Sequence, residues 1–452
     1  MRHPVYESPL PGWIDPARLA AVLFAGASDA VWLDSGMHAA DGMSYLGFGT
    51  RRLTASVAEN SITVDGQSRP GQVWDFLGED MARLHPATGS GFALGWVGWL
   101  GYELHAQTMG VTSAHRSRFA DASLLFVDLA LVFDHAAGTV AVIGLDAASV
   151  DGLHARVIGR DDFPSAPGQG DRPQKAEAVW AASDEGYLRM IAECQAAIDA
   201  GDAYQLCLTT EVRVAVTPDP FETYLALRSA SPSHHGAFFR AGDTSLLSAS
   251  PEVFLTVAPD GTIESQPIKG TRRRGDTEEA DLALVAELLA SDKERAENLM
   301  IVDLMRNDIG RVSEVGSVTV PRLLAVETYA HVHQLVSTVR GRLAAGLTGV
   351  DAVRACFPAG SMTGAPKHSA VTILDRLEHR ARGVYAGAFG YFGLDGRIEL
   401  SMVIRSILLD ADGASIGTGG GITALSVPAE ELAEVKLKSA ALLAVLGVDP
   451  SA

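Results

Sequence analysis

The segment Ser265-Gln-Pro-Ile-Lys-Gly-Thr-Arg-Arg-Arg-Gly275 places a single lysine, Lys269, directly after a Pro-Ile step. Its residue types predict a strand that ends in a Gly-Thr turn, with a basic turn at Arg272 to Arg274. A lysine shielded from water at such a place can act as a nucleophile. An ordinary exposed lysine is the alternative, because most lysines are solvated. Lys269 is therefore a candidate for covalent chemistry.

The overall composition limits the classes of partner that this chain can bind. It has 452 residues, and 36 Lys and Arg against 55 Asp and Glu give a formal net charge of −19. A hydrophobic content of 47% is enough for one or two large cores and excludes disorder over most of the length. The negative charge argues against nucleic acid and anionic membranes as partners. An anionic ligand would need a local basic pocket.

Cysteine usage and the first residues predict the cellular setting. The chain has three cysteines, which are far apart and form no C-x-x-C pair: Cys194, Cys207 and Cys356. This spacing indicates neither a disulfide framework nor a thiolate zinc site. Met1 to Gly12 carries prolines and charges instead of an apolar signal segment, and no apolar run is long enough to span a membrane. We expect a soluble, cytoplasmic protein.

A break in composition divides the chain into two regions. Residues 161–175, DDFPSAPGQGDRPQK, have almost nothing to bury and predict a surface linker between regions 1–160 and 176–452, which we expect to intertwine in one globule. Before the break, the runs Ala93 to Trp99 and Leu124 to Phe133 predict strands. After it, the spacing of apolar residues predicts a helix over Tyr187 to Ile198 and then a strand over Tyr204 to Val216.

Two predicted helices each carry a pair of carboxylates on one face. Ser291 begins an S-x-x-E capping box and a helix with Glu294 and Glu297, and Pro428 begins a helix with Glu431 and Glu434. If the two faces meet, their oxygens suit Mg²⁺, whereas no histidine spacing typical of zinc occurs. A solvated helix face is the alternative for each pair.

Two segments rich in glycine and proline permit close approach of the backbone to a ligand. Gly417 to Ile422 lacks the Gly-Lys-Ser/Thr ending of a P-loop, so a nucleotide site is poorly supported, but the amides of such a turn can bind a small anion. Phe357 to Lys367 predicts a Pro/Gly loop that leads into a helix.

Taken in order, these segments resemble the catalytic region of the chorismate-utilising enzymes, which include anthranilate, aminodeoxychorismate, isochorismate and salicylate synthases. The matching blocks are Ser248-Ala-Ser-Pro-Glu252, Pro267-Ile-Lys-Gly-Thr-Arg272, Asp303-Leu-Met-Arg-Asn-Asp308, Phe357 to Lys367, Tyr385-Ala-Gly-Ala-Phe-Gly-Tyr391, Ile404-Arg405 and Gly419 to Lys438. Weaker matches lie at Leu33-Asp-Ser35, Ser44-Tyr-Leu-Gly47 and Gly98-Trp-Leu-Gly-Tyr-Glu103. The resemblance implies an α+β fold in which two mainly antiparallel β-sheets pack face to face, with helices outside and the active site between the sheets.

Within this family, three positions favour the branch that makes 4-amino-4-deoxychorismate. The P-I-K-G-T form around Lys269 is typical of that branch, Gln205 stands where the water-using branches have a lysine, and Gln334 replaces a histidine usual in anthranilate synthase. The resemblance thus implies an Mg²⁺-dependent transferase of 4-aminobenzoate and folate biosynthesis. Its substrates would be chorismate and ammonia, the latter from a separate glutamine amidotransferase partner. Anthranilate synthase is the main alternative, and salicylate or isochorismate synthase and a catalytically silent binding protein are further ones.

The resemblance also implies a role for each matching residue. Lys269 would be the nucleophile and Glu252 the general acid, and the metal ligands would be Glu294, Glu297, Glu431 and Glu434. The substrate would contact Gln205, Gly270, Thr271, Gln334, Tyr385, Arg405, Gly419, Gly420, Gly421 and Lys438. A tryptophan pocket would lie beside Leu33, Asp34 and Ser35.

Overall fold

The computed structural model describes residues 4–37, 39–83, 91–92, 94–160, 176–329 and 332–449. The predicted linker at 161–175 lies outside the described residues, as does Ala93 of one predicted strand. Within these ranges, no helix is both long and apolar enough to cross a membrane.

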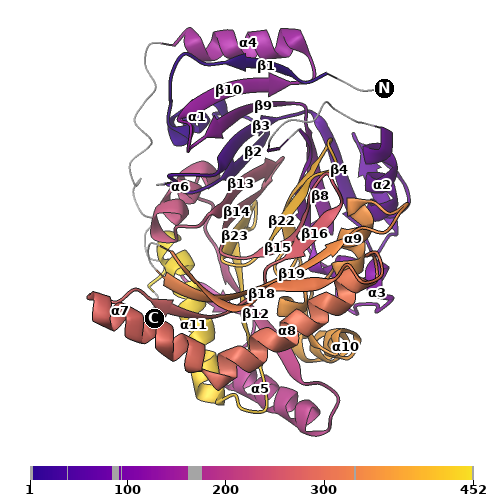
Figure 1. Cartoon of the computed structure of the whole chain (residues 1–452), viewed down its shortest axis with the longest axis vertical. Helices are drawn as coiled ribbons and strands as arrows, with labels where there is room; N and C mark the ends of the chain where they lie inside the picture. The colour runs from indigo at the N-terminus through magenta and orange to yellow at the C-terminus, as the bar shows by residue number, and fades with distance from the viewer. Residues whose placement is uncertain are drawn as a thin grey trace.

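Two antiparallel sheets form the body of the protein, which confirms the predicted fold class (Figure 1). The first sheet has the order β1 (Tyr6–Pro9), β10 (Thr139–Gly144), β9 (Leu129–Asp134), β3 (Met43–Phe48), β2 (Asp29–Asp34), β13 (His235–Ala241), β14 (Thr244–Ser250), β23 (Ser406–Asp410), β24 (Gly413–Ile422), β12 (Gln205–Val214) and β11 (Ala178–Trp180), with β20 (Gly364–Ala365) beside β12. The second has the order β17 (Ile268–Arg273), β19 (Val332–Arg342), β16 (Thr262–Ser265), β15 (Val253–Val257), β22 (Ile398–Met402), β21 (Ala388–Gly393), β7 (Gly95–Leu100), β8 (Ala122–Val127), β4 (Arg51–Ser56), β5 (Ser61–Val64) and β6 (Gln67–Pro70), with β18 (Thr319–Thr328) beside β19.

Each sheet contains one block of strands from each region of the chain, and the two blocks meet at a single strand pair. In the first sheet β2 pairs with β13, and in the second β7 pairs with β21. The run Leu124 to Phe133, predicted as a strand, is two strands in different sheets: β8 ends before Asp128 and β9 begins after it. The prediction of one element was wrong because both strands are apolar, and only the polar Asp128 marks the crossing from one sheet to the other.

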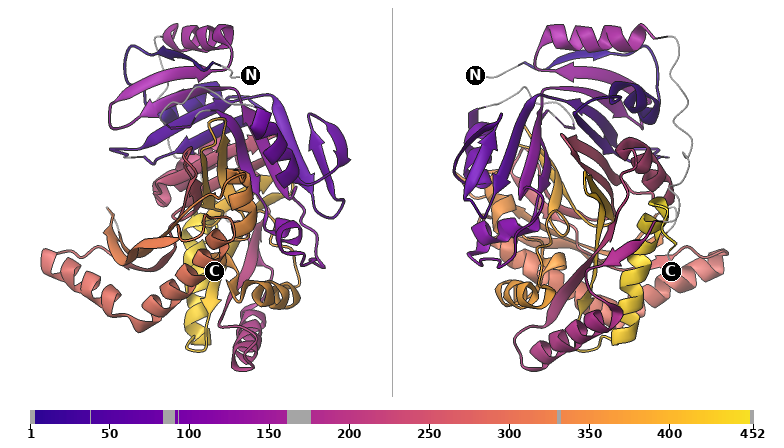
Figure 2. Two further views of the ribbon diagram at one scale, coloured as in Figure 1. Left: turned by 45° about the vertical axis from the view of Figure 1, so that its right-hand side comes forward. Right: turned by 180° about the vertical axis from the view of Figure 1, so that it is seen from behind.

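Helices cover the outer faces of the two sheets. They are α1 (Pro16–Leu23), α2 (Val73–Arg83), α3 (His105–Met109), α4 (Ala147–Ile158), α5 (Asp184–Asp199), α6 (Pro220–Ala230), α7 (Glu278–Ala290), α8 (Asp292–Gly310), α9 (Gly349–Cys356), α10 (Lys367–Glu378) and α11 (Pro428–Val445), with 3-10 turns η1 (Tyr102–Leu104) and η2 (Gly360–Met362). The alternation of strand side chains places Val31 in the core between the sheets and its neighbour Trp32 in the core beneath the outer helices. In Figure 2, α7 projects away from the body.

Several local predictions agree with these elements. Ser291 caps α8 by accepting a hydrogen bond from the Glu294 N–H, and Pro428 is the first residue of α11. The predicted helix over Tyr187 to Ile198 is α5, and the strand that follows is β12.

Two predicted turns are strands instead. Lys269 to Arg273 lie within β17, and the glycine run from Gly417 lies within β24. Tertiary pairing overrides the low strand propensity of glycine here, because β24 is paired with β12 along the entire run.

Candidate active site

A cavity of about 600 Å³ lies where β17, β24, α8 and α11 meet. It gathers almost all of the residues that the sequence singled out, from segments more than a hundred positions apart. The predicted residues in its lining are Glu252, Lys269, Gly270, Thr271, Glu294, Glu297, Gln334, Tyr385, Arg405, Gly419, Gly420, Gly421, Glu431, Glu434 and Lys438.

Lys269 and Glu252 both line this cavity. The Lys269 side chain is 17% exposed, and its Nζ lies 3.9 Å from Oε2 of Glu297. Burial raises the pKa of Glu252 above its ordinary value, although Lys269 and a hydrogen bond with Ser361 counteract this effect. A raised pKa favours the protonated carboxyl, the form that a general acid needs. The cavity thus brings together the two residues predicted to act as acid and nucleophile, and their roles stay predictions.

The backbone at Gly270 allows α8 to lie close to Lys269. Gly270 has φ of 86°, and a Cβ at this position would lie 2.8 Å from Leu288 Cδ1 and 3.1 Å from the Glu294 carboxyl group. Both the left-handed conformation and the close approach require glycine. Buried Asn298 then fixes α8 by donating to the carbonyls of Pro267 and Leu335, each at 3.3 Å.

The four predicted metal ligands line the cavity, each beside a cation. The ion pairs are Lys269–Glu297 at 3.9 Å, Arg272–Glu294 at 3.6 Å, Lys293–Glu431 at 3.4 Å and Lys438–Glu434 at 2.7 Å. Among the described residues, no three His, Cys, Asp or Glu side chains are grouped closely enough to hold a metal ion. Burial raises the pKa of Glu297, the cations Lys269 and Lys293 counteract this effect, and Glu294 and Glu431 add a smaller increase. Carboxylate oxygens are ligands that Mg²⁺ prefers, but each of these four is paired with a cation here, so the metal site stays a prediction.

The opposite side of the cavity offers donors to an anion. Within the described ranges, the guanidinium of Arg405 has no hydrogen bond or ion pair, and burial lowers its pKa. The described pairing of β24 with β23 ends at Ile416, so from Gly417 onward that edge of β24 has amides free to bind a ligand. Lys438 donates to the Gly419 carbonyl at 3.0 Å. These groups can bind a carboxylate.

Tyr385 packs directly on Gly417. A Cβ on Gly417 would lie 2.0 Å from Cγ of the tyrosine ring, so only glycine leaves room for that ring. Burial raises the pKa of the Tyr385 hydroxyl well above its ordinary range, which keeps it protonated and able to donate a hydrogen bond.

One predicted substrate contact does not line the cavity. Gln205 is 1% exposed and lies behind the glycine strand, where its Nε2 is 2.3 Å from the position of a Cβ on Gly421. Gln334 does line the cavity and faces Thr271 across the β17–β19 pair. Contact of Gln205 with a substrate stays a prediction.

Other residues that support the cavity were missed by the sequence reasoning. Lys367 begins α10 and binds Asp308 together with the carbonyls of Cys356 and Pro358, at 2.9 and 2.7 Å. It therefore connects two of the matching blocks, Asp303 to Asp308 and Phe357 to Lys367. Their buried polar residues are the signal in the sequence, but only the fold shows which ones pair.

A buried ionic network lies beneath the segment that carries Tyr385. Arg382 donates to both carboxylate oxygens of Glu378, at 2.9 and 2.7 Å, and to the carbonyls of Met362 and Cys207, at 2.6 and 2.8 Å. The carboxylate of Glu103 accepts the N–H groups of Arg382 and Gly383, at 2.7 and 3.0 Å. Because Met362, Cys207 and Tyr385 line the cavity, this network determines where its wall lies.

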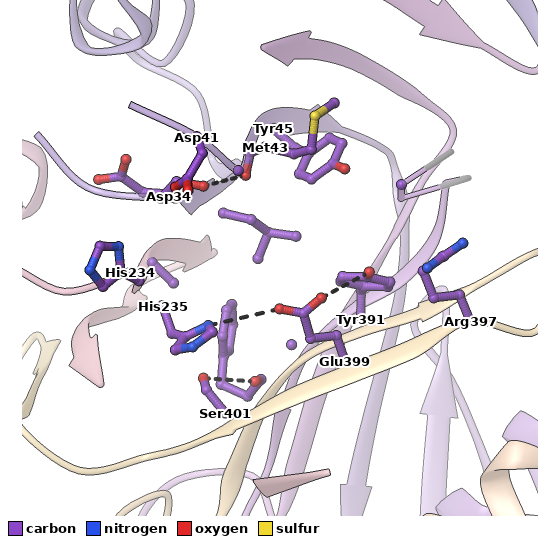
Figure 3. A pocket seen from close by; sticks show the side chains of 18 of the residues that line it. Asp34, Asp41, Met43, Tyr45, His234, His235, Tyr391, Arg397, Glu399 and Ser401 are labelled. Atoms are coloured by element: carbon purple, nitrogen blue, oxygen red, sulfur yellow. Dashed lines mark hydrogen bonds and ion pairs between the residues drawn. The ribbon is translucent and has the colours of Figure 1, made fainter. Parts of the chain in front are cut away.

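The predicted tryptophan pocket corresponds to a second cavity of about 570 Å³, which Leu33, Asp34 and Ser35 help to line. Figure 3 shows His235 and Tyr391 on either side of Glu399 within it. Four donors already satisfy the Asp34 carboxylate: Nε and Nη2 of Arg228, the hydroxyl of Tyr224 and the Gly36 N–H. The Asp34 carboxylate is therefore committed within the protein, and tryptophan binding stays a prediction.

Comparisons with known proteins agree with this geometry. A family profile described as chorismate binding enzyme matches residues 31–444. An aminodeoxychorismate synthase from Streptomyces pristinaespiralis is 42% identical over 94% of this chain, which spans 62% of that protein's length. Anthranilate synthase component 1 from Spirochaeta aurantia is 38% identical over 81% of this chain and 79% of its own length. The crystal structure of anthranilate synthase component I from Streptococcus pneumoniae matches with a TM-score of 0.79 and 29% identity, over 95% of this chain and 97% of that one.

Proposed function

Because this chain belongs to the chorismate binding enzymes, we propose that it converts chorismate and ammonia to 4-amino-4-deoxychorismate and water. The observation that carries the proposal is Lys269 beside Glu252 in a cavity that has carboxylates on one side and anion receptors on the other. The relative at 42% identity is named aminodeoxychorismate synthase, which supports the same reaction.

Chorismate is a dicarboxylate, and the two sides of the cavity suit its two carboxylates. The enolpyruvyl carboxylate would bind Arg405, the Tyr385 hydroxyl, Lys438 and the free amides of β24. The ring carboxylate would lie toward α8 and α11, with Gly270 and Thr271 beside the ring. This orientation would bring the ring carbons between Lys269 and Glu252.

Mg²⁺ would be held by Glu297 and Glu434, with Glu294 and Glu431 close by. These carboxylates are now neutralised by Lys269, Lys293, Lys438 and Arg272, so metal binding would replace these ion pairs. The ion would supply positive charge that binds and polarises the ring carboxylate. It would also release the Lys269 amine from Glu297.

The proposed chemistry assigns one task to each of two residues. Once released from Glu297, Lys269 would lose a proton to solvent and attack C2 as the neutral amine. The two conjugated ring double bonds shift, and the C4–O bond breaks while Glu252 gives its proton to the departing hydroxyl, which leaves as water. Ammonia then adds at C4, the two double bonds shift back, and the C2–N bond to Lys269 breaks, which releases the neutral amine. The ammonium formed at C4 loses one proton, which restores Glu252.

Ammonia would come from a glutamine amidotransferase partner. The test uses the purified chain alone with chorismate and Mg²⁺, supplied with either ammonium salts or glutamine. We expect product from ammonium salts and none from glutamine, and turnover of glutamine by this chain would contradict the need for a partner.

The role of Lys269 is tested by Lys269→Ala with Lys436→Ala as the matched control. Lys436 is a lysine of α11 that pairs with Asp184 on the surface. We expect Lys269→Ala to lower formation of 4-amino-4-deoxychorismate by at least about 1,000-fold, since covalent catalysis is lost, while the control keeps the parent rate. An unchanged rate in Lys269→Ala would exclude the covalent route.

Anthranilate formation is the second candidate, because two of the similar proteins are anthranilate synthases. The two reactions differ in their products: anthranilate is fluorescent and is released with pyruvate, whereas 4-amino-4-deoxychorismate needs a lyase before it becomes aromatic. Assay of pyruvate without added lyase therefore distinguishes them.

A further inference from the structure

A second pocket, of about 380 Å³, adjoins the active-site cavity at Tyr385 and Gly417, which line both. We call it the rear pocket. Its charged lining residues are Arg116, Arg118, Arg213, Arg380, Arg382 and Glu211. Five of these six charged residues are positive, whereas the chain as a whole has a net charge of −19.

One face of the β12–β24 pair runs from the active-site cavity into the rear pocket. Across this pair Gly419 lies opposite Thr209, and Gly417 lies opposite Glu211. Positions two apart on a strand share a face and are separated by about 7 Å. The rear pocket thus begins about 7 Å from Gly419, with the Tyr385 ring between the two spaces.

Three of the five arginines are neutralised by carboxylates. Arg118 pairs with Asp410, Arg213 with Glu211 at 3.0 Å, and Arg382 with Glu378 at 2.7 Å.

The other two guanidinium groups keep their positive charge uncompensated. Arg380 donates to the Thr209 hydroxyl at 2.7 Å and to the Ala381 carbonyl at 3.1 Å, both of which are uncharged. Across the described ranges, no ion pair joins either Arg116 or Arg380 to a carboxylate. Two positive charges at one concave site attract an anion of charge −2, and guanidinium groups match the oxygens of phosphate and carboxylate.

We propose that the rear pocket binds a small dianion, either a phosphate group or a dicarboxylate, through Arg116 and Arg380. This site is distinct from the one proposed for chorismate, which uses Arg405 and the free edge of β24. Both sites can therefore be filled at once, and Tyr385 is the shared wall through which one can affect the other. The proposal does not depend on which reaction the active site catalyses.

The test is isothermal titration of the purified chain with inorganic phosphate and, separately, with succinate. Each titration is done in Mg²⁺ without ammonia, with and without saturating chorismate, so that the active site is filled but no amination occurs. We expect one site per chain that persists with chorismate. The probe with the lower Kd, phosphate or succinate, identifies the class of anion that the site prefers. Preference for either one supports the proposal.

Arg116→Ala is the decisive variant, because Arg116 is exposed and its loss should not disturb folding. We expect it to weaken binding about tenfold, the usual effect of losing one charge-assisted hydrogen bond at a solvated site. Arg156→Ala, at an exposed position of α4, removes the same charge elsewhere and should leave binding unchanged. Equal effects of the two variants, or loss of binding when chorismate is added, would overturn the proposal. If chorismate binding gives no measurable heat, the anion affinities of the Arg116 and Arg156 variants still decide whether the rear pocket is the binding site.

Discussion

Replacing Glu103 by glutamine should change how the stability of the protein depends on pH. Glu103 is 4% exposed, and burial raises the pKa of its carboxyl from 4.5 to about 7, although the hydrogen bond from the Arg382 N–H lowers it; the charge of Asp121 adds a smaller increase. The folded state therefore binds this proton more tightly than the unfolded state. Its stabilising effect is complete below pH 4.5 and is lost as the pH rises through about 7.

The size of this effect follows from the two pKa values. At about 1.4 kcal/mol for each tenfold difference in proton affinity, the full effect is about 3.5 kcal/mol, of which about 2.5 kcal/mol falls between about pH 5 and pH 8.5. Glu103→Gln should lack this contribution. The variant should also be less stable than the parent at low pH by about 1 to 3 kcal/mol. Glu103 accepts two backbone N–H groups, and the NH2 end of a glutamine amide cannot accept one of them, so that donor would lose its partner.

Urea unfolding, followed by tryptophan fluorescence, measures the effect across this pH range. Four buried tryptophans report on the cores: Trp32, Trp74, Trp96 and Trp99. Glu185→Gln, at an exposed position of α5, controls for the loss of a charge. The informative quantity is the unfolding free energy of the parent minus that of the Glu103 variant. A difference that stays constant from about pH 5 to pH 8.5 would mean that Glu103 is already ionised in the folded protein, and the reasoning would be refuted.

Three further predictions concern the proposed reaction. Burial raises the pKa of Glu252, so kcat should fall as the pH rises through that value, and Glu252→Gln should lower kcat at least about 100-fold. Glu297→Gln should raise the Mg²⁺ concentration for half-maximal activity at least about tenfold, measured by titrating metal into the stripped chain. Arg405→Met should raise KM for chorismate by about 10- to 100-fold with an unchanged unfolding midpoint, because its guanidinium has no partner among the described residues.

Short-range patterns in the sequence predicted the pieces of this site well. Ser291 and Pro428 specify the beginnings of α8 and α11, and these determine which face carries each pair of glutamates. The antiparallel sheets came from the family resemblance, because a pattern of strands does not by itself give their order.

The remainder depends on tertiary structure that no local pattern contains. Gly417 to Ile422 has the composition of a turn, yet it is a strand because β12 pairs with it. Asn298 and Arg382 are polar residues that a sequence places on the surface, but the fold buries both and satisfies them with backbone carbonyls. The division of Leu124 to Phe133 between two sheets likewise depends on distant partners.

The pairing of early strands with late strands, once in each sheet, has a consequence for biosynthesis. When β7 leaves the ribosome, its partner β21 is still about 290 residues away, and β2 must wait for β13. At about 5 to 20 residues per second, the edge of β7 that β21 will cover stays open for roughly 15 to 60 seconds. Open edges rich in apolar residues are prone to associate with other chains. Yield in the cell should therefore respond to translation speed and to chaperones that shield nascent strands.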